Sequence, residues 1–276
     1  MSKKFKILFI VFMFIFSNLL TGCSKLDNIK VKLGMKNKDF EYIKEGKINK
    51  VIIQNVRDKG FTFIVTDKSS IKELYDILSE AKEVENKITL ESDYVLEFQE
   101  SHHEVHKFNY IAGLDKTDAG NLYGDDKIYI VSKRLDDDIM KNFWNIRRPK
   151  EFKDVYYKSI IMALKEYRKS LNGNEKIGID MDDQYASKFI LTMDLEEFKE
   201  GLSSNEEIIR DDNTNKYDVI MNITTEGYKS EIYKCIITFY YKQDKKETKY
   251  YFTNKYDEDI GAWQFTLSVD KKPENF

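Results

Sequence analysis

The C-terminal part of the chain alternates between apolar and polar residues more regularly than any other. Apolar side chains occupy every second position of residues 233–241, and shorter alternating runs lie at residues 219–223 and 263–269. Turn-forming residues separate these runs, as at Glu226-Gly227. Successive strand residues point to opposite faces, so this period predicts strands with one buried and one solvated face. Consecutive strands of this kind form an antiparallel meander.

An amphipathic helix precedes the meander. Residues 152–171 carry apolar side chains at helical spacing, and Asn172-Gly173 ends the run. We expect this helix to cover the dry face of the sheet, which suggests, by analogy of fold alone, a cystatin-like shape or that of nuclear transport factor 2. Between helix and meander we expect short strands at residues 176–181 and 189–193, a brief helix from Asp194 and a polar loop over residues 203–216.

The preceding hundred residues predict a second, separate α+β unit. Strands are expected at residues 51–56, 61–65, 94–99, 106–112 and 127–132. Asp67 or Ser69 caps an amphipathic helix after the second strand, and a closing helix contains Ile139, Phe143 and Ile146. The predicted order is ββαβββα. Pro149 disfavours helix at its predecessor and marks the boundary, giving α+β domains at residues 48–149 and 150–276.

The first of these domains resembles the YhfM-like domain of small bacterial lipoproteins. The resemblance rests on residues 63–67, the helix at 71–84, and residues 93–98 and 127–132. It implies a lipoprotein module and carries over no catalytic residue.

The N-terminus has the layout of a secretory signal peptide. Lys3, Lys4 and Lys6 precede an apolar run shorter than the ~20 residues of a membrane-spanning helix. Leu20-Thr21-Gly22-Cys23 then resembles the lipobox of bacterial lipoproteins, which implies removal of residues 1–22 and acylation of Cys23, for example with palmitate. An uncleaved signal anchor and an ordinary cleavable signal are the alternatives. The acyl chains would hold the protein in the lipid bilayer, on the outer side of the cytoplasmic membrane.

The charge of the chain bears on the class of partner that it binds. Removing residues 1–22 takes away three lysines and no acids, leaving 42 basic and 48 acidic residues, a net charge near −6. This argues against nucleic-acid binding, which favours a basic face. Residues 23–47, with seven lysines after Cys23, are expected to form a solvated tether; attraction of these lysines to anionic headgroups is the alternative.

One segment has the residue types of a metal site. All three histidines lie in Ser101-His102-His103-Glu104-Val105-His106, and on a strand His102, Glu104 and His106 would share one side. Same-side neighbours are about 7 Å apart, so the three converge on Zn²⁺ only if the strand bends. An exposed hairpin end between two strands is the alternative, and we expect no resident metal or other cofactor.

The other candidate sites have simpler interpretations. Asp211-Asp212-Asn213-Thr214-Asn215 departs from a calcium loop in lacking the glycine and the final glutamate, and the segment from Asp115 to Gly120 fits less well, so both are expected to be polar turns. The Asp180, Asp182 and Asp183 carboxylates are expected in a solvated loop rather than in acid–base catalysis. Cys235 lies on an apolar strand face as a small buried residue. The 18 tyrosines are expected to fill cores, a ligand-binding sheet face being the alternative.

Together these features predict a membrane-anchored extracytoplasmic lipoprotein that binds an envelope protein or polymer without catalysis. A metal- or carboxylate-dependent envelope hydrolase is one alternative. A small-ligand carrier with a pocket between the 152–171 helix and the C-terminal sheet is another.

Overall fold

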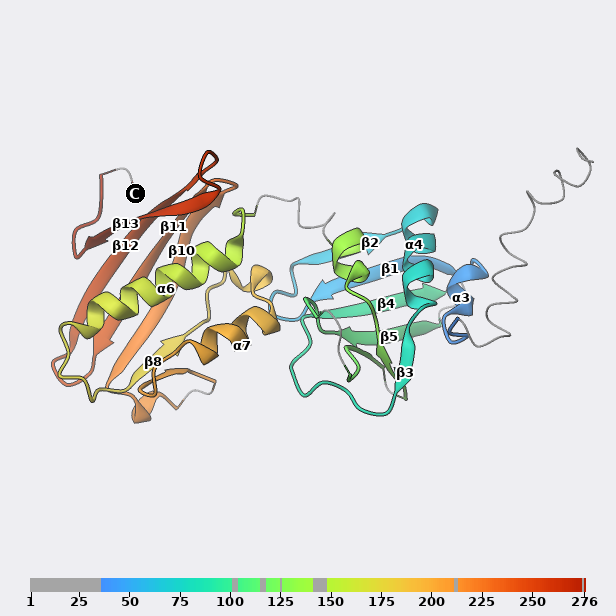
Figure 1. Cartoon of the computed structure of the whole chain (residues 1–276), viewed down its shortest axis with the longest axis horizontal. Helices are drawn as coiled ribbons and strands as arrows, with labels where there is room; N and C mark the ends of the chain where they lie inside the picture. The colour runs from blue at the N-terminus through green and yellow to red at the C-terminus, as the bar shows by residue number, and fades with distance from the viewer. Residues whose placement is uncertain are drawn as a thin grey trace, which may run out of the picture.

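A computed structural model describes residues 36–100, 104–114, 118–124, 126–140, 148–210, 213–274 and 276. Two α+β domains lie side by side, each built on its own sheet (Figure 1). Cys23 and the predicted signal peptide lie outside the described residues. Within the described part of the chain, no helix is both long and apolar enough to cross a bilayer.

The first domain contains a seven-stranded antiparallel sheet in the order β2-β1-β4-β5-β6-β7-β3. Its strands are β1 (Ile48–Asn55), β2 (Thr62–Val65), β3 (Lys82–Val84), β4 (Tyr94–Glu100), β5 (Val105–Tyr110), β6 (Leu122–Tyr123) and β7 (Ile128–Ile130). Alternate residues of β1 and β4 point inward and pack with α4 (Lys68–Leu78) and a π-helix (Leu135–Met140) in one core. Asp67 caps α4, its carboxylate accepting from the Ser70 N–H at 2.9 Å, as expected.

Parts of this domain differ from the prediction made from the sequence. The expected helix 71–84 ends at Leu78, and Lys82–Val84 pairs with β7 at the edge of the sheet instead. The helical spacing continues through Lys82–Val84, but these three residues pair with β7 as a strand. The short strand β6 was not predicted. Of the closing helix, Ile139 lies in the π-helix, whereas Phe143 and Ile146 lie outside the described residues.

The first domain also begins earlier than Ile48. Phe40 is fully buried and Ile43 nearly so, and both belong to the domain's core. Ile43 lies in a one-turn helix, α3 (Glu41–Lys44), which the Tyr75 hydroxyl joins to α4 by donating to Glu41 at 2.8 Å. The end of the segment expected to be a tether is therefore part of the folded domain.

The second domain contains a six-stranded sheet in the order β13-β12-β11-β10-β8-β9. Strands β10 (Val219–Lys229), β11 (Ile232–Tyr241), β12 (Lys246–Asp257) and β13 (Ala262–Val269) form the predicted antiparallel meander. Helix α6 (Phe152–Arg168) lies across the sheet, and the ring of Tyr167 stacks on that of Phe239 with centroids 4.0 Å apart (Figure 1). The predicted two-domain α+β class is confirmed.

Two short strands extend the meander in parallel. β8 (Ile177–Asp180) pairs with β10, and β9 (Glu206–Ile208) pairs with β8. β9 lies within the predicted polar loop. The prediction of a strand at residues 189–193 is wrong. Ser187–Phe189 forms a 3-10 turn, and α7 (Thr192–Glu200) begins at Thr192.

Candidate functional site

A buried carboxylate joins the two domains. Asp93, just before β4, has no exposed surface. One of its oxygens accepts from the backbone N–H of Thr192 at 2.7 Å and from the Thr192 hydroxyl at 2.9 Å, both in the second domain. The other accepts from the Ala112 N–H at 3.0 Å. Buried charges are tolerated when paired and hydrogen-bonded, and this one has partners on both sides of the junction.

Arg57 supplies the opposite charge. Its guanidinium donates to Asp93 at 2.7 Å and to the Ile190 carbonyl at 3.2 Å, and it also contacts the Thr192 hydroxyl. Because the guanidinium presents several donors in a fixed plane, it holds one residue of its own domain and two of the other in a defined geometry. The Arg57 side chain is 18% exposed.

Further contacts surround this pair. Asn55 at the end of β1 is fully buried, and its amide donates to the Lys188 carbonyl of the second domain at 3.3 Å. Its side-chain oxygen accepts from the Arg57 N–H at 2.9 Å, which shapes the turn carrying Arg57. Leu191 packs against the core of the first domain. The turn after β1 and the segment between β8 and α7 therefore hold the domains together.

A cleft of about 460 Å³ opens beside this junction. The first domain contributes Arg57 and three consecutive residues before β4, and the second domain contributes α7 and the end of β9. The lining residues are Arg57, Thr89, Leu90, Glu91, Met181, Thr192, Leu195, Glu196, Lys199, Ile208, Ile209 and Arg210. Apolar side chains are thus combined with a few charged groups, as in many ligand sites at domain interfaces.

The charges of the cleft are largely paired within the protein. Arg57 is bound by Asp93, and Lys199 forms an ion pair with Glu196 one turn earlier on α7. Arg210 is exposed at the rim. Paired, positioned charges beside an apolar wall can orient a ligand.

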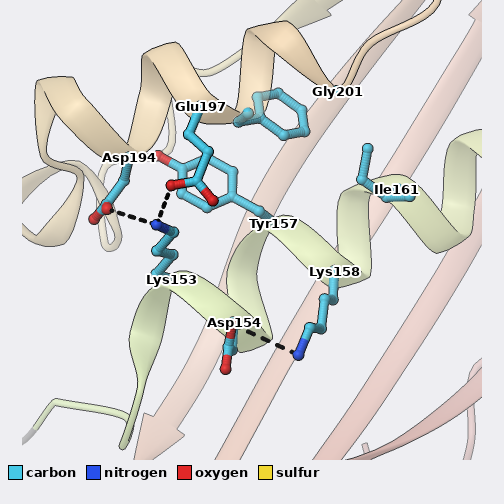
Figure 2. Close-up of a pocket in the computed structure, with 9 residues that line it drawn as sticks. Lys153, Asp154, Tyr157, Lys158, Ile161, Asp194, Glu197 and Gly201 are labelled. Atoms are coloured by element: carbon cyan, nitrogen blue, oxygen red, sulfur yellow. Dashed lines mark hydrogen bonds and ion pairs between the residues drawn. The ribbon is translucent and has the colours of Figure 1, made fainter.

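A smaller groove of about 220 Å³ lies between α6 and α7 (Figure 2). Lys153 of α6 forms ion pairs with Asp194, at 3.3 Å, and with Glu197, both of α7. The rings of Tyr157 and Phe198, which also line the groove, stack with centroids 4.9 Å apart. Burial raises the pKa of Asp194, and Lys153 opposes that shift. The ion pairs thus join the two helices across the groove.

The predicted histidine cluster is only partly described. His102 lies outside the described residues, while Glu104 and His106 belong to the hairpin end between β4 and β5. The group that joins them is Glu100, whose carboxylate lies 2.9 Å from His106 Nε2. Sequence spacing missed Glu100 because it belongs to the opposite strand.

Asp183 is not in a solvated loop. It is 2% exposed and accepts from the N–H and hydroxyl of Thr225 at 3.1 and 2.7 Å. Burial raises the pKa of Asp183, and these hydrogen bonds oppose the rise. Asp182 is exposed and Asp180 half-buried, so the three carboxylates do not form one catalytic group. Asp183 instead ties the loop after β8 to β10.

The remaining candidates have structural roles or lie partly outside the described residues. Asp211, Asp212 and Asp115 lie outside, and Asn213 accepts from the Asn215 N–H in a turn. Cys235 is buried, as predicted, and burial raises the pKa of its thiol to about 12. The fully buried tyrosines include Tyr110, Tyr156 and Tyr233. Core side chains also fill the space between α6 and the sheet where a carrier pocket was considered.

Comparison with known proteins supports the family resemblance of the first domain. Residues 44–149 match the family model described as YhfM protein. The first domain is YhfM-like. The match extends from the end of α3 to Pro149 and so includes Arg57 and Asp93, but not Thr192. No curated protein and no solved structure matched the chain.

Proposed function

We propose that this protein is a lipoprotein anchored through acylated Cys23 on the outer side of the cytoplasmic membrane. The positive N-terminal residues, the short apolar run and Leu20-Thr21-Gly22-Cys23 support this proposal. The first domain matches the YhfM family model over residues 44–149, and the sequence resemblance associates such a domain with small bacterial lipoproteins. The tether between membrane and domain would then end before Asn37, which already bonds to the first domain through the carbonyls of Ser79 and Ala81.

We further propose that the folded part is a non-catalytic binding module that takes an envelope protein or polymer at the cleft between the domains. The observation that carries this proposal is the cleft itself, whose two walls come from different domains held by Asp93, Arg57 and Thr192. Preformed walls reduce the entropy lost on binding. The apolar side chains Leu195 and Ile209 offer contact area, and the charged rim offers orientation.

Site-directed photo-cross-linking on intact cells tests this function. A photo-reactive residue replaces Glu91 or Ile209 in the cleft, and Ile260, 70% exposed at the β12–β13 turn, serves as the control position. We expect the same discrete adduct from both cleft positions and none from the control. Filling the cleft with Thr89→Trp, at an exposed lining position, should reduce the adduct formed from Ile209. Equal adducts from all three positions, or none from the cleft, would contradict the proposal.

A further inference from the structure

The end of the β4–β5 hairpin brings three metal-ligating side chains to one face. Antiparallel pairing sets Phe98 opposite His106, and the Glu100 N–H donates to the Glu104 carbonyl at 2.8 Å in the next step of the ladder. Directly opposed residues of an antiparallel pair point to the same face, as do residues two apart on one strand. Glu100, Glu104 and His106 therefore share the face that continues the core of the first domain.

The ligand atoms of these residues are close together. One carboxylate oxygen from each glutamate and one ring nitrogen of His106 all lie within 4.8 Å of one another. The Glu100 side chain is 9% exposed and that of His106 is 27% exposed, whereas Glu104 is exposed. Two ligands are thus held by the fold, and the third can adjust by rotation of its side chain.

Packing against Tyr42 holds the ring of His106 in place. The ring of Tyr42 stacks on that of His106 with centroids 4.0 Å apart, and Tyr42 precedes Ile43, which is anchored in the core. The hydrogen bond to Glu45, and then the negative charges of Glu45, Glu100 and Glu104, raise the pKa of Lys47. Lys47 is about half exposed and forms its ion pair with Glu45, 2.7 Å away. Lys47 directly precedes Ile48, which pairs with Glu100 across β1 and β4, so its positive charge lies near a metal ion bound by Glu100.

We propose that Glu100, Glu104 and His106 bind one Zn²⁺ ion at this hairpin end. Zinc takes imidazole nitrogen and carboxylate oxygen at about 2.0–2.2 Å, so tetrahedral ligands lie about 3.4 Å apart. Because the ligand atoms lie within 4.8 Å of one another, binding needs a closure of at most about 1.4 Å, which exposed Glu104 can supply. Binding would replace the contact between His106 and Glu100 with two bonds to the metal, and the fourth position would take water. The site is separate from the cleft and does not depend on its function.

Calorimetric titration of the full chain in detergent with ZnCl₂ tests the proposal. We expect one Zn²⁺ per chain with micromolar affinity, and at least tenfold weaker binding in Glu100→Gln and in His106→Gln. Glu97→Gln is the matched control, because it makes the same chemical change on the same strand but on the opposite face, where Glu97 pairs with Lys107 at 3.1 Å. Its affinity should equal that of the unmodified protein.

A further variant separates loss of ligands from loss of fold. Lys47→Gln removes the competing positive charge and should tighten Zn²⁺ binding by about threefold, as expected for one partly exposed charge. Loss of fold in this variant would weaken binding instead, and unchanged or weaker binding by Lys47→Gln would contradict the proposed position of the ion. Binding that appears only at millimolar Zn²⁺, or that survives His106→Gln but is lost when His102 and His103 are both replaced by alanine, would overturn the proposal.

Discussion

The substitution Asp93→Asn should weaken the junction between the domains more than any exposed change of the same kind. Asp93 accepts four hydrogen bonds, from Arg57, Ala112 and both donors of Thr192. Asparagine keeps one acceptor oxygen and replaces the other with an NH₂ group. That group must face an N–H or guanidinium donor whichever way the amide is turned, and the charge of Arg57 loses its partner.

The size of the effect follows from burial. Removing one partner of a buried ion pair typically costs about 3–5 kcal/mol. Arg57 is 18% exposed and keeps its bond to the Ile190 carbonyl, so part of its charge remains solvated or bonded. We therefore expect the free energy of unfolding to fall by about 2–4 kcal/mol. Thr192→Val, which keeps the backbone donor, should cost about 1 kcal/mol.

Urea unfolding followed by circular dichroism measures this change. Asp76→Asn is the control, because Asp76 is bound to Lys72 at 2.7 Å on an exposed face of α4, where such pairs contribute less than about 1 kcal/mol. The proposed role of Asp93 is refuted if the free energies of unfolding of Asp93→Asn and Asp76→Asn differ by less than 0.5 kcal/mol, about the scatter of additivity tests.

Three further outcomes are expected. Gly178→Ala should destabilise the protein by about 1–3 kcal/mol in urea unfolding, because a Cβ there would lie 2.5 Å from the Tyr217 ring, whereas Gly227→Ala, with open space, should not. Burial raises the pKa of Asp136 to about 6, so its protonated form stabilises the fold at low pH. The stability of the unmodified protein relative to Asp136→Asn should accordingly fall by roughly 2 kcal/mol from pH 4 to pH 7; no change with pH would contradict this. The Cys235 thiol, buried and with a pKa of about 12, should resist a thiol reagent at pH 8 until urea unfolds the domain; rapid labelling of the native protein would contradict its burial.

The main elements were predictable where a period extended over many residues. The alternation around Cys235 predicted β11 and its neighbours, because buried and more exposed side chains alternate along the whole strand. Strands of two or three residues, such as β3 and β6, are too short to show a period. The apolar run at residues 189–193 fits a strand locally, but Leu191 packs on the other domain and α7 starts at Thr192.

The junction could not be predicted for a different reason. Asp93 lies 36 residues from Arg57 and 99 from Thr192, and none of the three belongs to a recognisable spacing. Their contact depends on how two complete domains meet. The hairpin cluster was half predicted, because same-strand spacing selects Glu104 and His106, whereas only the β4–β5 register adds Glu100.

Metabolic labelling of intact cells with a clickable fatty acid tests the central claim, attachment through Cys23, most directly. The chain should incorporate the label and, with its folded part outside the membrane, be digested by protease added to cells stripped of their wall. Cys23→Ala should lose the label entirely while keeping the same circular dichroism spectrum. A Cys23→Ala protein that is still labelled, or an unlabelled native protein found in the cytosol with residues 1–22 intact, would contradict the account.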